Sequence, residues 1–149
     1  DNKLAGDSGG TPWQISNGPL SPVPKRPNVG AYSLGMSVRP GKLVYLAGQV
    51  SVDADGTLVG KGDAAAQTRQ ALQNLGHVLS GAGADSSNVV EFTTYVVGRS
   101  SIQEYIKGRS EVYPEIFPNG DFPPNTLLIV AGLVNEDFLV EIKAVAALP

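Results

Sequence analysis

Cysteine is absent from this 149-residue sequence, histidine occurs once, and no long apolar run is present. Without thiols the chain forms no disulfides, thiolate nucleophiles or iron–sulfur sites, and one histidine is too few for a typical transition-metal site. No stretch approaches the ~20 apolar residues of a membrane-spanning helix. We therefore expect a protein without a metal site and without a membrane partner.

Basic charge is also scarce, because 14 Asp and Glu outnumber 11 Lys and Arg and give a net charge of −3. The basic residues are scattered rather than gathered in the stripe that is typical of nucleic-acid binding. Hydrophobic residues make up 42% of the chain, as in a globular domain large enough to bury a core. We expect a small organic molecule as partner, and a cytoplasmic location, with a leader removed before Asp1 as the alternative.

The first 28 residues are rich in Gly, Pro, Ser and Asn and show no periodicity, which predicts an extended arm before a single domain at 29–149. The string Gly6-Asp7-Ser8-Gly9-Gly10 in this arm matches the nucleophile pentapeptide of chymotrypsin-like proteases. We reject a protease, because the chain is too short for two barrels and a triad is defined by geometry rather than by a string.

The periodicity of the domain predicts the element order βββαβαββ. Asp63 is placed to cap the first helix, and a hairpin turn is expected at Asp53-Ala54-Asp55-Gly56. This order favours an α+β fold in which two helices cover one face of a mainly antiparallel sheet. The expected strands cover 31–38, 43–52, 57–59, 89–97, 126–133 and 138–147, and the expected helices cover 64–80 and 101–117.

The second face of the sheet should also be covered. Residues 126–133 are apolar on both sides of the strand, and 43–50 behave similarly, whereas a sheet face open to water normally alternates with polar residues. The predicted elements leave nothing to cover this face. Self-association is the natural cover, and folding of the N-terminal arm across the face is the alternative.

Glu141 is the most informative charged residue, because it lies in the middle of a predicted strand on a face that should be covered. A carboxylate in such a place is costly unless it is paired or hydrogen-bonded, and such groups are candidates for functional sites. The alternative is a pair with Lys143 at the rim of an oligomer interface. The spacing alone does not decide between the two.

Six short motifs stand out along the chain: Gly30-Ala31-Tyr32-Ser33, Leu46-Ala47-Gly48-Gln49-Val50, Gln70-Ala71-Leu72-Gln73-Asn74-Leu75, Val89-Val90, Pro123-Pro124-Asn125-Thr126 and Val140-Glu141-Ile142-Lys143-Ala144-Val145-Ala146. In this order, over about residues 28–148, they resemble the RidA family, also called YjgF or endoribonuclease L-PSP. The resemblance implies a chorismate-mutase-like fold, a homotrimer with clefts between subunits, and hydrolysis of reactive imines and enamines without a metal or cofactor.

The resemblance carries the family's functional positions over unevenly. Its cleft tyrosine falls on Tyr32 and its water-orienting glutamate on Glu141, but its helix asparagine falls on Ser110 and its key arginine on Asn125. An arginine clamps a carboxylate with two parallel hydrogen bonds, which asparagine cannot do. The usual 2-imino acid is therefore not the expected substrate, unless another cation such as Lys143 or Arg109 replaces the clamp.

We interpret the chain as a cofactor-free hydrolase or deaminase-like enzyme for a small molecule with an imine, enamine or related carbonyl-like centre. Glu141 is expected to polarise water or move a proton, and Asn125, with the backbone amides around Thr126 and Leu127, to orient the substrate. Tyr32 and Ser110 are expected to line the cleft. A non-catalytic ligand-binding or regulatory protein is the alternative, and the acidic balance and single histidine argue against a ribonuclease.

Overall fold

The computed structural model describes residues 30–39 and 41–149. The predicted arm at 1–28, with its protease-like pentapeptide, lies outside these residues. The elements of the described part are β1 (Lys42–Gln49), α1 (Ala64–Gly81), the 3-10 helix η1 (Ser86–Asn88), β2 (Val89–Val97), α2 (Ser101–Ile116), β3 (Asn125–Val130) and β4 (Val140–Leu148).

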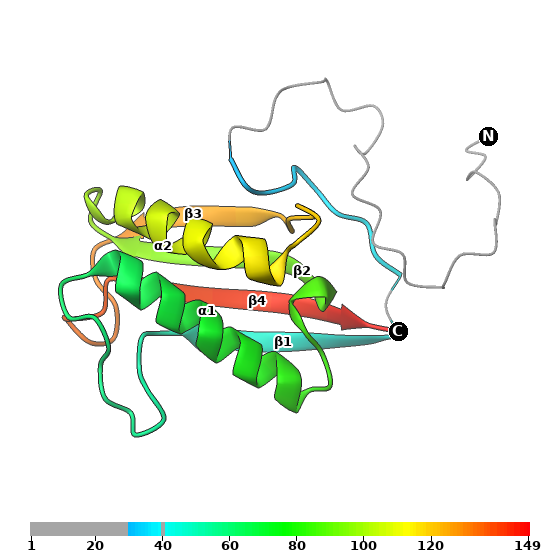
Figure 1. Ribbon diagram of the computed structural model, residues 1–149, viewed down its shortest axis with the longest axis horizontal. Helices are drawn as coiled ribbons and strands as arrows, with labels where there is room; N and C mark the ends of the chain where they lie inside the picture. Colours follow the sequence, from blue (N-terminus) through cyan, green and yellow to red (C-terminus); the bar gives the residue numbers. More distant parts are fainter. Residues whose placement is uncertain (1–29, 40) are drawn as a thin grey trace.

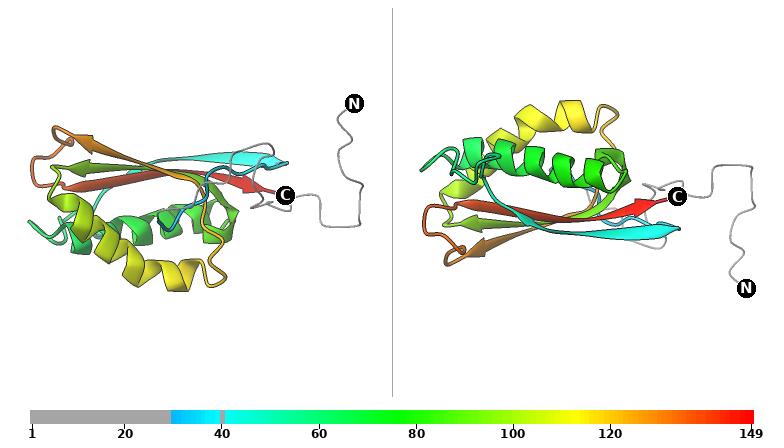
Figure 2. Two further views of the ribbon diagram at one scale, coloured as in Figure 1. Left: turned by 90° about the horizontal axis from the view of Figure 1, so that it is seen from above. Right: turned by 90° about the horizontal axis from the view of Figure 1, so that it is seen from below.

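The four strands form one sheet in the order β1-β4-β2-β3. β4 runs antiparallel to both of its neighbours, whereas β2 and β3 are parallel and are joined through α2, as a parallel pair requires. Figure 1 shows α1 and α2 side by side across the sheet, and the edge-on views of Figure 2 place both on the same face. The predicted α+β fold, with two helices on one face of a mainly antiparallel sheet, is confirmed.

The strand predicted over 31–38 does not form, and one residue of this segment, Ser37, has bridge geometry. Gly35 interrupts the segment, and glycine weakens a strand because it has no side chain to pack and loses more backbone freedom. The Ser33 N–H instead donates to the Pro123 carbonyl at 3.4 Å. The segment therefore lies against the loop before β3 rather than in the sheet.

The predicted hairpin after β1 forms its turn but not a full strand. The strand expected at 57–59 is reduced to a single antiparallel bridge between Val52 and Leu58. Asp53 closes the turn, since its Oδ1 accepts two backbone N–H groups at 2.9 Å, and Gly56 supplies the positive φ of 80°.

A capping residue begins α1, and a glycine lets the two helices pack closely. Asp63 caps α1, because its Oδ1 accepts the Ala66 N–H at 2.9 Å, as predicted. The helices lie close together at Gly108, where a Cβ atom would lie 2.5 Å from the Ala65 carbonyl oxygen. Among the described residues, no helix is long and apolar enough to cross a membrane.

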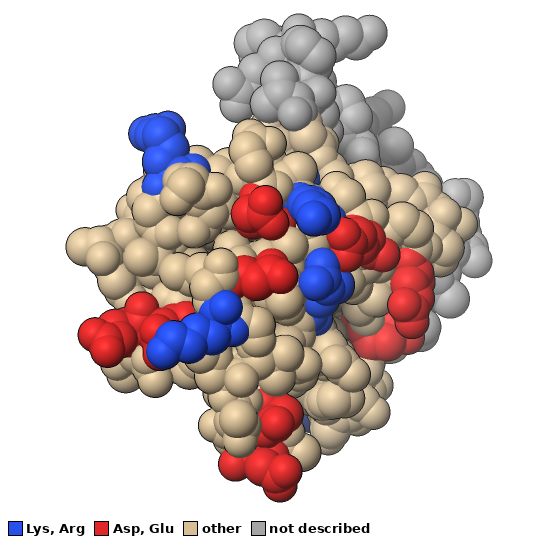
Figure 3. All heavy atoms as spheres, turned by 60° about the vertical axis from the view of Figure 1, so that its left-hand side comes forward, with Lys and Arg blue, Asp and Glu red and all other residues tan. Residues whose placement is uncertain are grey.

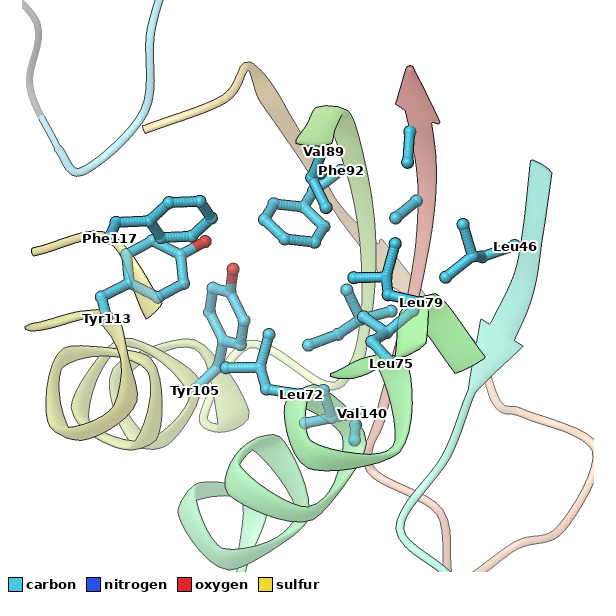
Figure 4. Close-up of a cluster of buried hydrophobic side chains, with 14 of the residues drawn as sticks. Leu46, Leu72, Leu75, Leu79, Val89, Phe92, Tyr105, Tyr113, Phe117 and Val140 are labelled. Carbon is cyan, nitrogen blue, oxygen red and sulfur yellow. The ribbon is translucent and has the colours of Figure 1, made fainter. Parts of the chain in front are cut away.

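The hydrophobic core fills the space between the sheet and the two helices (Figure 4). At the α2 side an aromatic group packs mostly edge to face, with ring centroids 5.1 to 6.2 Å apart, as such rings prefer. Its members are Phe92, Tyr113, Phe117 and Phe122.

The other face of the sheet carries no described helix (Figure 2). Three large apolar side chains on this face are exposed in the single chain, Leu43, Leu128 and Tyr45, the last of them at 76%. We call this surface the open face, and the surface under the helices the helix-side face. The apolar residues of the open face agree with the sequence pattern that predicted a covered surface.

Candidate functional site

Glu141 lies in the middle of β4 and points to the open face. Its neighbours Val140 and Ile142 are buried in the core under the helices, so the alternation of the strand turns Glu141 the other way. The side chain is half-buried, and the pairing of β4 with β2 places Tyr95 directly beside it. The carboxylate predicted from the sequence is thus held on a rigid, central strand.

Gly48 of β1 explains how the carboxylate fits against the sheet. A Cβ atom at this position would lie 2.7 Å from the Cδ atom of Glu141 and closer still to its Oε1. The Glu141 side chain therefore lies directly over the Gly48 backbone, a place that only glycine leaves open. Our sequence interpretation did not assign a role to Gly48, although the Ala47-Gly48-Gln49 motif marked it.

A second row of side chains crosses the open face beside Glu141. The strand register aligns Lys143, Thr93 and Thr126 across β4, β2 and β3. Lys143 is exposed, and neither of the two ion pairs within the described residues involves it or Glu141. The alternative pair of Glu141 with Lys143 is therefore not formed in the single chain.

Asn125, the second predicted catalytic residue, points to the helix-side face. Its Oδ1 accepts a hydrogen bond from the Thr94 Oγ1 at 2.9 Å, and its Nδ2 donates to the Tyr105 hydroxyl at 3.4 Å. The Thr94 and Tyr105 oxygens are 3.3 Å apart. Because the Thr94 hydroxyl has one proton, which it gives to Asn125, Tyr105 is the donor between them. The three side chains close a ring of hydrogen bonds, on the opposite face from Glu141.

The two residues expected to offer backbone amides lie on the strand that begins with Asn125. Thr126 is exposed on the open face, and Leu127 is half-buried on the helix-side face. Within the sheet, β3 is an edge strand, so part of its backbone N–H groups point away from β2. Because the Phe92 N–H donates to the Pro124 carbonyl, the parallel ladder turns the Thr126 N–H toward β2 and leaves the Leu127 N–H facing the free edge.

The two predicted cleft residues lie away from Glu141. Ser110 is exposed on α2 and donates its hydroxyl back to the Ile106 carbonyl at 2.7 Å, within its own helix. Tyr32 is half-buried beside Gly30, in the segment before β1. A single chain therefore brings neither of them to Glu141.

Arg109, one position before Ser110, is buried at 8% exposure. Its guanidinium carbon lies 5.4 Å from the ring centres of both Tyr105 and Tyr113, in cation–π range. The three residues recur at intervals of four on α2, and this spacing is the sequence signal for a shared helix surface. The sequence identified Arg109 as a spare cation but not as a buried one.

Charge elsewhere on the surface is mixed. On the side drawn in Figure 3, basic and acidic side chains are interspersed, without a continuous basic patch among the described residues. His77 is exposed on α1 and lines a shallow groove with Asp53 and Asn74. Within residues 30–39 and 41–149, no three His, Cys, Asp or Glu side chains gather as metal ligands.

Comparison with known proteins matches residues 23–148 to the family described as Endoribonuclease L-PSP. The chain belongs to the RidA family. The RidA resemblance read from the sequence motifs is thereby confirmed. The crystal structure of a Rid-family protein from Yersinia pestis matches with a TM-score of 0.72 and 35% identity, over 79% of this chain and 87% of that one.

Two curated relatives of this RidA-family chain have named activities. It is 32% identical to the 3-aminoacrylate deaminase RutC of Acinetobacter baylyi, over 85% of this chain and 90% of that protein. It is 30% identical to the human 2-iminobutanoate/2-iminopropanoate deaminase, over 79% of this chain and 80% of that protein. An imine deaminase-like role is therefore a property of the family around this chain.

Proposed function

We propose that the chain hydrolyses the C–N bond of a small, reactive imine, enamine or related molecule, with Glu141 as the group that handles the proton. The observation that carries this proposal is the half-buried Glu141 carboxylate, held over the Gly48 backbone and unpaired within the described residues. The named deaminases among the relatives support the same reaction class.

The chemistry needs a base, a water molecule and a proton donor. Water adds to the imine carbon while Glu141 takes one of its protons, and the carboxylic acid then returns the proton to nitrogen. The same carboxylate then moves the hydroxyl proton of the adduct to nitrogen, and ammonia leaves as the C–N bond breaks and the carbonyl forms, so one imine and one water give one carbonyl compound and one ammonia. An enamine enters the same path after it tautomerises to the imine, in which its carbon gains one proton and its nitrogen loses one. Every step uses groups that gain and lose protons only.

The complete site would combine two copies of the chain. Asn125 and Glu141 point to opposite faces of one sheet, so within one chain they cannot contact the same small molecule. A homotrimer that buries the open face, as the family resemblance implies, would bring a β3 edge of one copy near the β4 carboxylate of another. The exposed Tyr45 and Leu128 support such an assembly.

Asn125 bears on the choice of substrate. Its amide already closes a hydrogen-bonded ring with Thr94 and Tyr105, and a neutral amide cannot clamp a carboxylate as a guanidinium does. The loss of a charge-assisted contact weakens binding by roughly 10- to 200-fold. Substrates recognised through a carboxylate at the imine carbon itself are therefore expected to be poor.

The test is ammonia release from imines made in the assay by an amino-acid oxidase, compared with a panel of enamines. We expect little acceleration of 2-imino acid hydrolysis and clear acceleration of at least one other imine or enamine. Glu141→Gln should abolish that turnover while leaving the melting temperature nearly unchanged. Turnover that survives Glu141→Gln would exclude Glu141 as the proton-handling group.

A non-catalytic ligand-binding protein is the second candidate, and the engaged Asn125 amide favours it, because this residue has fewer groups free for a substrate. Calorimetry separates the two. Ligand binding that persists in Glu141→Gln, with no chemistry in the unaltered protein, would identify a binder. The mixed charge in Figure 3 gives no support to an RNA substrate.

A further inference from the structure

Arg109 is a buried cation that has no matching anion among the described residues. The residue is more than nine-tenths buried, and its Nε is fully shielded without a hydrogen-bond partner in the described part of the chain. No ion pair or hydrogen bond among the described residues uses its guanidinium. Arginine stays protonated under all ordinary conditions, and a buried charge is normally paired.

The neighbours of Arg109 attract a cation but do not neutralise it. The rings of Tyr105 and Tyr113 lie on either side, each 5.4 Å from the guanidinium carbon. Burial, reinforced by Tyr105, raises the pKa of Tyr113, and the opposing influence of Arg109 is smaller. Tyr113 therefore stays a neutral phenol and supplies no negative charge. None of the five N–H donors of the guanidinium has a hydrogen-bond partner among the described residues, although the Nε–H is shielded from solvent.

The position of this cation connects it to the predicted cleft residues. Arg109 precedes Ser110 on α2, and the ring of Tyr105 below it carries the hydroxyl that contacts Asn125. On the other side, a Cβ atom at Gly30 would lie 4.0 Å from the Arg109 Nη2. Of the described residues, Ser33 in the same segment holds the other buried side-chain polar atom without a partner.

We propose that Arg109 is a specificity-determining residue that binds the carboxylate of the ligand from α2, in place of an arginine on β3. The ligand is a small carboxylic acid, held by two parallel hydrogen bonds to the guanidinium. The cation lies on α2 rather than at the Asn125 position. We therefore expect the distance between the carboxylate and the reactive carbon of the ligand to differ from that in a 2-imino acid, where the two are directly bonded. This inference rests on the proposed function and adds that the substrate carries a negative charge.

The experiment follows the Arg109 Nε–H signal by NMR in nitrogen-15-labelled protein, at the assembly state of the unaltered chain. Levulinate, a stable 4-oxo acid, should shift this signal and bind with measurable affinity. Pyruvate, a 2-oxo acid whose carboxylate adjoins the carbonyl carbon, should bind more weakly, and neutral acetone should neither bind nor shift the signal. Arg109→Gln should weaken oxo-acid binding by about 10- to 200-fold, and Arg109→Lys by less, because lysine keeps the charge but not the fork.

Arg69→Gln is the matched control, since Arg69 is a partly exposed α1 arginine paired with Glu111 at 2.6 Å, and it should leave oxo-acid affinity unchanged. An unshifted Nε–H signal with equal affinities for the unaltered protein and Arg109→Gln would overturn the proposal. So would loss of the oligomer in Arg109→Gln with ligand affinity retained, because the guanidinium would then pair with a carboxylate of another copy. If Arg109→Gln does not fold, the Nε–H titration and Arg109→Lys decide.

The failure of this inference is distinguishable from that of the proposed function. Glu141→Gln should still show the oxo-acid-dependent shift of the Arg109 Nε–H signal, because anion binding needs no proton transfer. A shift without turnover of any imine or enamine would support Arg109 as the anion site and contradict hydrolysis. Turnover of an imine or enamine without a shift of the Arg109 Nε–H signal would support hydrolysis and contradict Arg109 as the anion site.

Discussion

The two faces of the sheet hold their polar groups in opposite ways. On the helix-side face, Thr94, Tyr105 and Asn125 satisfy one another in a closed ring of hydrogen bonds. On the open face, the carboxylate of Glu141 lies over glycine without an ion-pair partner in the described residues. The polar groups of the helix-side ring are hydrogen-bonded to one another, whereas the Glu141 carboxylate on the open face can still bind another molecule.

This difference separates stability from function. A polar group that is fully bonded within the chain contributes to folding and has little left for a ligand. A charged group left without a partner costs stability and is retained where it serves binding or catalysis. Substitutions on the helix-side face should therefore change the free energy of unfolding, and substitutions on the open face should change assembly and turnover.

The largest effect is expected from a charge on the open face. Tyr45→Lys would place an unpaired ammonium group in each contact of a trimer, at a cost of several kcal/mol per copy. Light scattering at micromolar concentration should show trimers for the unaltered protein and monomers for the variant. Val134→Lys is the control, because Val134 is an apolar residue outside the sheet with 92% exposure. A trimer of Tyr45→Lys would contradict burial of the open face.

The next largest effect is expected at Gly48, which lies beneath the Glu141 carboxylate. Gly48→Ala places a methyl group where the Glu141 side chain lies, so the carboxylate must move by about 1 Å or more. A displacement of that size costs about 100-fold in turnover. The melting temperature should fall by much less, because the flexible side chain can shift. Full turnover in Gly48→Ala would show that the position of the carboxylate is not critical.

The helix crossing gives a stability effect of intermediate size. Gly108→Ala should destabilise the protein by about 3 kcal/mol, because the new methyl meets the Ala65 backbone. Gly76→Ala is the matched control in a helix interior with open space, where alanine should stabilise by about 0.5 to 1 kcal/mol. Urea unfolding measures the free energy of unfolding of both variants. A change of the same sign in Gly108→Ala and Gly76→Ala would contradict the tight helix crossing.

The smallest effect comes from opening the hydrogen-bonded ring. Thr94→Val keeps the shape of the side chain but removes both the donor to Asn125 Oδ1 and the acceptor of the Tyr105 hydroxyl. The loss should cost about 1 to 2 kcal/mol, since Tyr105 is buried while the half-buried Asn125 can partly regain water. Ser110→Ala removes a hydroxyl from an exposed helix position and should stay within about 0.5 kcal/mol. Chemical denaturation measures both variants. If Thr94→Val and Ser110→Ala lower the free energy of unfolding by similar amounts, the hydrogen-bonded ring adds no more stability than an exposed helix hydroxyl does.

The sequence predicted the regular elements because their signals are local. The β-branched run at 89–97 and the capped helix from Asp63 form as expected. The segment at 31–38 was mispredicted, since Gly35 and contact with the Pro123 loop outweigh its strand propensity. A contact with a distant loop leaves no periodicity in the sequence, so this outcome could not be read from it.

The candidate site was predictable in part for the same reason. Strand alternation was enough to place Glu141 on the face away from the helices. Alternation did not reveal that Asn125 points the other way, because this depends on where β3 begins and how it is registered against β2. The burial of Arg109 between two tyrosines depends on the docking of α2, a tertiary event that residue spacing only suggests.

The position of β4 has a consequence for how the chain is made. β4 is the last strand of the fold in chain order, yet it lies between β1 and β2 and bonds to both. During synthesis β1 leaves the ribosome long before β4 and has no neighbour until then. Co-translational folding of the sheet must therefore wait for β4, and until it emerges the nascent chain exposes strand edges that are prone to aggregate.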